Sequence, residues 1–199
     1  MVTLAQEIAA LPQPLQSELL SHGFSADLLL RLASKMHEDL DARNRLADGV
    51  EPPSAQDLSS LPAAGTADLA HLEQLGTEAL CRGELAFIVL AGGMATRMGG
   101  VVKALVPAVG DKSFLDLRLA ENAHWTRIAG HPLPLWLMTS YATDGKLRET
   151  LGTRLHPDHL ATFQQNISVR VTEDGHVFRE DDGAPSIYAP GHGDLPEAL

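Results

Sequence analysis

The chain of 199 residues has little or none of several features that define whole classes of protein. It has one cysteine, Cys81, which excludes a disulfide framework and a zinc site built from several cysteines. No apolar run approaches the roughly 18 residues that a transmembrane helix needs. The first residues also lack the basic start and long apolar centre of a secretory signal. We therefore expect a cytoplasmic protein that does not enter a membrane.

Positive charge is also scarce. The chain has 15 Lys and Arg residues against 26 Asp and Glu residues, which gives a net charge of −11. A nucleic-acid-binding surface would need the opposite sign, because neutralisation of phosphates dominates that affinity, so we expect no nucleic-acid partner. Residues 92–131 are the exception, with five basic and three acidic side chains. An anionic ligand would be expected to bind in this region.

Residues 1–83 form a predicted small, all-helical N-terminal segment. The apolar spacing and the N-cap candidates Ser25 and Thr66 predict helices over residues 3–11, 14–22, 26–46 and 67–82. Prolines and serines mark residues 48–63 as a connection. One helix carries an apolar stripe that must be buried on the sheet or on a partner subunit. The stripe consists of Leu28, Leu29, Leu32, Met36 and Leu40.

From residue 84 to residue 199, apolar runs of strand length alternate with helical patterns. Strands are predicted at residues 86–91, 134–140 and 162–165, helices at 114–129 and 143–154, and a hairpin at 169–180. The first strand, which is continuously apolar, is expected to be covered on both faces. The alternation predicts an α/β fold with an open, mostly parallel, Rossmann-like sheet.

This predicted sheet is short. Only three parallel strands precede the last residues, and Pro196 to Leu199 have the pattern of a first helical turn. We therefore expect a truncated sheet in an incomplete nucleotide-binding domain, and the front part of a larger protein.

The strongest chemical signal is the loop LAGGMATRMGGVVK, residues 90–103. Gly92 and Gly93 let the backbone turn sharply after the first strand, and they leave backbone N–H groups accessible to phosphate oxygens. Arg97 and Lys103 can reach the same phosphates. The loop matches neither the Walker pattern nor the dinucleotide fingerprint. The glycines alone leave open a tight strand-to-helix turn with solvated basic residues.

This loop resembles the signature of nucleotide-sugar pyrophosphorylases, and above all of their UTP:sugar-1-phosphate uridylyltransferase branch. That branch includes UDP-glucose and UDP-N-acetylglucosamine pyrophosphorylases. Three later motifs resemble the same branch in the same order. They are Met138-Thr139-Ser140 followed by Thr143, Phe163-Gln164-Gln165, and Pro190-Gly191-His192-Gly193-Asp194.

The resemblance implies a nucleotidyltransferase and a role for each matching residue. A sugar-1-phosphate, expected to be glucose-1-phosphate, would attack the α-phosphorus of UTP in line, with Mg²⁺ bridging the phosphates. Arg97 and Lys103 would be catalytic, and His192 would contact the sugar phosphate. Gln165 would read the uracil edge, and Gly191 would lie against the base. The other nucleotide-binding residues implied are Leu90, Ala91, Gly92, Gly93, Met94 and Thr96.

The sequence departs from the family pattern at three places. Ala95 and Val102 stand where the family usually has glycine and proline. The family's metal-binding aspartate falls beyond Leu199, so no metal ligand is assigned here. His156 and His159 lack further ligands, which favours an exposed loop over a metal pair.

Two other functions stay open at this point. One is a module that binds UTP or a UDP-sugar without catalytic activity. The other is an interaction protein that self-associates through its helical N-terminal segment or through an exposed sheet edge.

Overall fold

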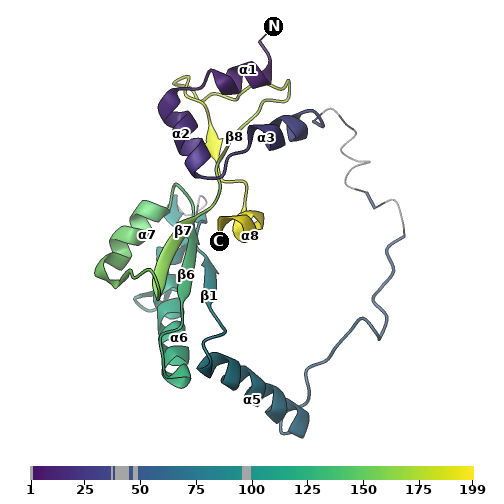
Figure 1. The fold of residues 1–199 in the computed structure, drawn as a ribbon, viewed down its shortest axis with the longest axis vertical. Coiled ribbons are helices and arrows are strands. Elements are labelled where there is room, and N and C mark those ends of the chain that lie inside the picture. The colour runs from purple at the N-terminus through teal and green to yellow at the C-terminus, as the bar shows by residue number, and fades with distance from the viewer. Residues whose placement is uncertain (1, 37, 39–44, 47–48, 96–99) are drawn as a thin grey trace.

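A computed structural model of the chain, shown in Figure 1, places a parallel sheet with its flanking helices beside a separate group of short helices. The structure describes residues 2–36, 38, 45–46, 49–95 and 100–199. No helix within these ranges is both long and apolar enough to cross a membrane. The main sheet is parallel and open, which confirms the predicted α/β fold.

Three parallel strands form the main sheet, in the order β1 (Phe87–Leu90), β6 (Leu135–Thr139) and β7 (Leu160–Gln164). The central strand β6 is almost wholly buried, as its apolar sequence predicts. Strand β1 lies at the edge of the sheet, and Leu90 at its end is 45% exposed. The prediction that β1 is covered on both faces is wrong, because none of its four residues is fully buried.

Two helices cover the sheet. Helix α6 (Phe114–Ala129) begins with a capping box, in which Ser113 accepts from the Asp116 N–H and Asp116 accepts from the Ser113 N–H. It ends at Gly130, whose φ of 78° is left-handed. Helix α7 (Asp144–Leu151) follows β6. The core between sheet and helices is aliphatic, and each buried leucine contributes roughly 1.5–3 kcal/mol. Its leucines are Leu115, Leu135, Leu137, Leu147, Leu151 and Leu160.

Helix α5 (Ala67–Cys81) begins at the predicted cap, where Thr66 accepts a hydrogen bond from the Leu69 N–H. It packs on α6 through a small cluster of Leu80, Ala129 and Leu133. Residues 49–66, which precede it, extend away from the body of the protein (Figure 1). The remaining short elements precede α6 or follow α7. They are β2 (Met94–Ala95), β3 (Val101–Val102), η2 (Lys103–Leu105), β4 (Pro107–Val109), β5 (Lys112–Ser113) and η3 (Gly152–Arg154).

The N-terminal helices α1 (Leu4–Ala9), α2 (Gln13–Ser21) and α3 (Ala26–Ala33) pack away from the main sheet. They cover the chain that follows β7, including the antiparallel pair of strands β8 (Ser168–Val169) and β9 (Ile187–Tyr188). In Figure 1 the purple helices surround the yellow β8. Their shared core joins the N-terminal helices to the chain that follows β7. It contains Ile8, Leu11, Leu19, Leu29, Ile167, Val169 and Val177.

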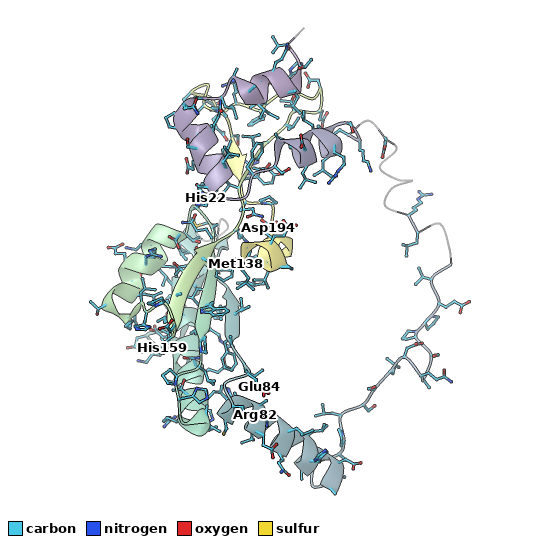
Figure 2. All side chains as sticks on the ribbon, in the orientation of Figure 1. His22, Arg82, Glu84, Met138, His159 and Asp194 are labelled. Atoms are coloured by element: carbon cyan, nitrogen blue, oxygen red, sulfur yellow. The ribbon has the colours of Figure 1, made fainter. Side chains whose placement is uncertain are left out.

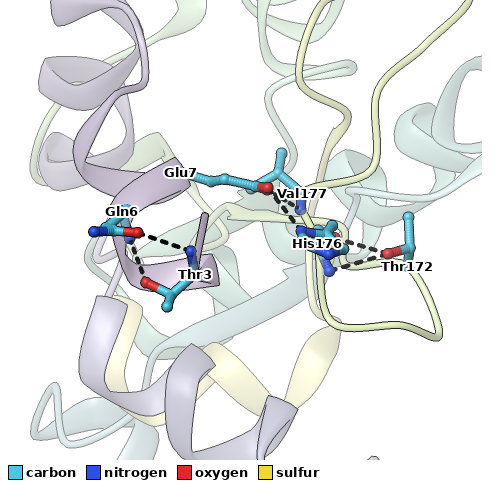
Figure 3. A network of polar contacts seen from close by, with 6 residues as sticks. All are labelled: Thr3, Gln6, Glu7, Thr172, His176 and Val177. Carbon is cyan, nitrogen blue, oxygen red and sulfur yellow. Dashed lines mark hydrogen bonds and ion pairs between the residues drawn. The ribbon is translucent and has the colours of Figure 1, made fainter. Parts of the chain in front are cut away.

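A polar contact reinforces this packing (Figure 3). The Glu7 carboxylate accepts a hydrogen bond of 2.7 Å from the Val177 N–H and lies 2.8 Å from His176 Nδ1. The hydrogen bond from Val177, and then that from His176, lowers the pKa of Glu7. The predicted hairpin that carries His176 is confirmed, since Thr172 and His176 pair across the turn at Gly175.

Helix α3 is shorter than predicted. It ends at Ala33 instead of continuing to residue 46, and of its apolar stripe Leu29 is buried whereas Leu28 and Leu32 are 43% and 51% exposed. Because helices are held mainly by tertiary packing, a stripe that contacts the core through one leucine does not sustain a longer helix. Leu40 lies outside the described residues. Self-association through this segment stays a prediction.

Candidate functional site

Residues one or two positions after the ends of the three parallel strands meet at one edge of the main sheet. Gly92 follows β1, Ser140 follows β6 and Gln165 follows β7. The ladder extends to this edge, because the Ala91 N–H donates to the Met138 carbonyl at 2.7 Å and the Gln165 N–H to the Thr139 carbonyl at 2.8 Å. The carboxyl edge of an open parallel sheet is where such folds bind ligands. The topology thus gathers three of the four sequence motifs.

Gly92 is in close contact with the other two strand ends. A Cβ atom at this position would lie 3.1 Å from Gln165 Oε1 and 3.2 Å from the Ser140 backbone nitrogen. Gly92 and Gly93 do not adopt positive φ. The turn itself therefore does not require glycine at these positions, whereas the close approach of neighbouring groups to the Gly92 backbone does.

Buried hydroxyl groups hold the Gly92 loop in place. Ser140 Oγ donates to the Gly92 carbonyl at 3.0 Å, and Thr143 Oγ1 accepts from the Ser140 N–H at 3.0 Å. Thr139 Oγ1 donates to Asp144 Oδ1 at 2.8 Å. The motif Met138-Thr139-Ser140 with Thr143 thus fixes the position of the Gly92 loop through hydrogen bonds. The N–H groups of Gly92 and Gly93 donate to no protein group in the described part of the chain.

A pocket of about 400 Å³, which we call the Gln165 pocket, opens at this edge. Gln165 as a whole is 4% exposed, and its amide makes no hydrogen bond to a described residue. Among the described residues, Asp194 Oδ2 is the side-chain polar atom that is fully buried without a partner, so the Gln165 amide is accessible from the pocket that it lines and can bind a molecule there. Gly191 also lines the pocket, with a φ of 140° that favours glycine. The other lining residues include Gly92, Met94, Ser140, Arg170, Tyr188 and His192.

A second pocket of about 520 Å³, the Lys103 pocket, lies on the β1 side of the loop. Its lining is mostly apolar, with Lys103, Arg118 and His192 as the polar side chains. A Cβ atom at Gly93 would lie 3.4 Å from Lys103 Cδ, and the Lys103 N–H donates to the Gly93 carbonyl at 3.1 Å. His192 lines both pockets, so the two adjoin at the glycine loop.

Most of the predicted site residues therefore come together. Those that line one or both pockets are Leu90, Ala91, Gly92, Gly93, Met94, Lys103, Gln165, Gly191 and His192. Thr96 and Arg97 lie outside the described residues. Arg118, Arg170 and Tyr188 also line the pockets, although no motif in the sequence marks them.

Asp194, the last residue of the Pro-Gly-His-Gly-Asp motif, lies beside the short helix α8 (Leu195–Ala198), after the turn η4 (His192–Asp194) (Figure 2). Its Oδ2 atom is buried without a hydrogen-bond partner among the described groups. Burial, together with the charge of Glu197, raises the pKa of this carboxyl. Asp194 lines neither pocket, and the described residues contain no cluster of three or more metal-ligating side chains.

The family profile described as UTP–glucose-1-phosphate uridylyltransferase matches residues 30–199. The chain belongs to this family. A probable UTP–glucose-1-phosphate uridylyltransferase of Schizosaccharomyces pombe is 32% identical over 121 residues, which cover 58% of this chain and 24% of the relative. The UDP-N-acetylhexosamine pyrophosphorylase-like protein 1 of Xenopus tropicalis is 28% identical over 171 residues, or 79% of this chain and 34% of the relative.

The fold of this uridylyltransferase-family chain also matches a solved structure. The UDP-N-acetylglucosamine pyrophosphorylase of Trypanosoma brucei superimposes with a TM-score of 0.65 at 22% identity, over 98% of this chain and 44% of that one. The resemblance seen in the four motifs is confirmed at the level of family and fold. The chain spans about a quarter of the length of the S. pombe relative.

Proposed function

We propose that this chain binds UTP at the carboxyl ends of β1, β6 and β7 for uridylyl transfer to a sugar-1-phosphate. The observation that carries the proposal is the Gln165 amide, which makes no hydrogen bond to a described residue and lines the same pocket as Gly92 and Gly191. A uracil edge offers an N–H beside a carbonyl, and a carboxamide offers the complementary acceptor and donor. The unpaired N–H groups of Gly92 and Gly93 would bind the nucleotide's oxygens.

The proposed reaction needs no covalent enzyme intermediate. A phosphate oxygen of the sugar-1-phosphate forms a bond to the α-phosphorus of UTP. The bond from that phosphorus to the oxygen bridging to the β-phosphate breaks, and pyrophosphate leaves with the electron pair. Lys103 and Arg97 together would hold the triphosphate and stabilise the charge that builds on the leaving group. His192, which lines both pockets, would contact the sugar phosphate.

Magnesium fits this site only through the nucleotide. The described residues that line the two pockets include no carboxylate. Mg²⁺ in phosphoryl-transfer sites takes many of its ligands from phosphates and water, and when bound it would neutralise phosphate charge. We propose Mg²⁺ as a companion of UTP.

We choose glucose-1-phosphate as the sugar substrate. The family profile and the S. pombe relative both carry the name of the glucose enzyme, which supports this choice, whereas the X. tropicalis relative is named for the hexosamine enzyme. The test is release of pyrophosphate by the chain from UTP and Mg²⁺ with glucose-1-phosphate, compared with N-acetylglucosamine-1-phosphate. Faster release with the N-acetylated sugar would overturn the choice of sugar.

A second candidate function is binding without turnover. It is favoured by the absence of a carboxylate from the described lining of both pockets. Calorimetric titration with UTP separates the two candidates. Binding without pyrophosphate release would support the binding module, release would support the enzyme, and the absence of both would overturn UTP recognition itself.

A further inference from the structure

Gln165 alone does not distinguish uracil from cytosine. Its amide presents a donor and an acceptor side by side, and a rotation of 180° exchanges them. One orientation pairs with the N–H and carbonyl of uracil, and the other with the ring nitrogen and amino group of cytosine. No described protein group hydrogen-bonds to this amide and selects an orientation. If the chain prefers uridine nucleotides, another group in the pocket must supply the preference.

Arg170 lines the same pocket and is held by its surroundings. Its backbone N–H donates to the Ser186 carbonyl, and its carbonyl accepts from the Phe178 N–H, both at 2.9 Å. Its Nη1 donates to Ser186 Oγ at 3.0 Å, and its Cζ lies 5.5 Å from the centre of the Tyr188 ring. Because Ser186 is 2% exposed, it is a fixed anchor for the guanidinium.

A guanidinium carries five N–H donors and no acceptor. Arg170 donates one side-chain hydrogen bond, from Nη1 to Ser186 Oγ, and its remaining guanidinium N–H groups donate to no described residue. Tyr188, which lies under the guanidinium, also lines the pocket. The pocket therefore contains, in addition to the ambiguous amide, a side chain that can only donate.

We propose that Arg170 selects uracil over cytosine by donating a hydrogen bond to the 4-carbonyl oxygen of the base. This rests on the proposed binding of UTP in the Gln165 pocket. Uracil has a carbonyl at this position, whereas cytosine has an amino group that would place a second donor against the cation. The base recognised is then the one whose edge suits both side chains, and the orientation of Gln165 follows from it.

The test is calorimetric titration of the 199-residue chain with UTP and with CTP under identical salt and Mg²⁺. Arg170→Met removes the donors and keeps an unbranched side chain. Arg179→Met is the matched control, because Arg179 also makes one hydrogen bond from Nη1, to the Gly183 carbonyl, and lines neither pocket. Arg170→Lys, which keeps a charged donor in a different geometry, provides a second variant if the first does not fold.

We expect the wild-type chain and Arg179→Met to bind UTP about tenfold or more tightly than CTP, the value of one charge-assisted hydrogen bond. Arg170→Met should lose most of this ratio, mainly through weaker UTP binding, and Arg170→Lys should be intermediate. A ratio unchanged in Arg170→Met, with both nucleotides weakened equally, would show a phosphate contact or a packing role and overturn the inference. Equal wild-type affinities would overturn it while leaving the proposed function intact, and absence of UTP binding would overturn the proposed function.

Discussion

Replacement of Gly92 by alanine tests the site at its most crowded point. The added methyl group would lie 3.1 Å from Gln165 Oε1 and 3.2 Å from the Ser140 nitrogen. The Gln165 amide can rotate away, but the Ser140 backbone is held by its hydrogen bond to Thr143 Oγ1. The loop itself must therefore shift by a few tenths of an ångström, and the 3.0 Å bond from Ser140 Oγ to the Gly92 carbonyl is strained or lost.

Overpacking of this kind costs about 1–3 kcal/mol, and if the loss falls on the nucleotide complex it corresponds to roughly 5- to 150-fold weaker UTP binding. Gly93→Ala is the matched control. Its methyl group would lie 3.4 Å from Lys103 Cδ, an ordinary contact with the movable part of a long side chain. We expect Gly93→Ala to change the affinity by about twofold or less.

Calorimetric titration with UTP measures both variants, and thermal unfolding shows whether either has lost its fold. The expected result is a large loss of affinity in Gly92→Ala and a small one in Gly93→Ala. Equal affinities in wild type and Gly92→Ala would refute the argument from close approach. An equal loss in both variants would show that the loop needs glycine for another reason, such as backbone freedom on binding.

Three further predictions concern the pocket and its support. The pKa of Glu7 is lowered, so its carboxylate stabilises the fold at neutral pH, and this contribution is lost as the pH falls below about 4. Glu7→Gln should therefore have a lower melting temperature at pH 7, and its melting temperature should change less than that of the wild type as the pH falls. Identical melting temperatures of the two proteins across this pH range would contradict the prediction. Gly191→Ala should weaken UTP binding and destabilise the chain by about 1–3 kcal/mol in urea unfolding, because its φ of 140° suits glycine; an unchanged urea midpoint would contradict this. The pKa of Asp194 is raised, so its ionised form costs stability at neutral pH. Asp194→Asn should therefore melt later at pH 7, and the difference should shrink as the pH falls toward about 4 and be gone below it. A lower melting temperature of Asp194→Asn at pH 7 would contradict this.

The elements that depend on neighbouring residues could be predicted from the sequence. The Ser113 and Thr66 side chains each accept a hydrogen bond from the backbone N–H three residues later, and Gly130 ends α6 in the left-handed conformation. Each of these residues therefore acts on groups within one helical turn of its own position. The buried strand β6 follows from five consecutive residues. Contacts between distant segments could not be predicted in this way. The residue pattern of α2 shows that Leu19 lies on an apolar face of this helix. It does not show that Leu19 packs in the same core as Ile167.

The same division applies to the site. Gln165 and Gly191 stand in motifs whose order along the chain matches a family, so they could be predicted to meet, and both line one pocket. Arg170 stands in no motif. Its place in the pocket depends on Ser186 and Tyr188, which are brought beside it by the pairing of β8 with β9. The spacing of residues within one segment carries no signal for such a contact.

The N-terminal helices have a structural part in this pocket although they contribute no residue to its lining. The strands β8 and β9 have two residues each, and a ribbon of that size is not stable alone; its apolar side is covered by Ile8, Leu19 and Leu29. The turn after α2, marked by His22 in Figure 2, lies beside the chain that follows Gln165. The His22 carbonyl accepts from the Ile167 N–H at 3.1 Å, and a Cβ atom at Gly23 would collide with Asn166. Since these contacts fall on the two residues after Gln165, the position of its amide depends on residues at the opposite end of the sequence.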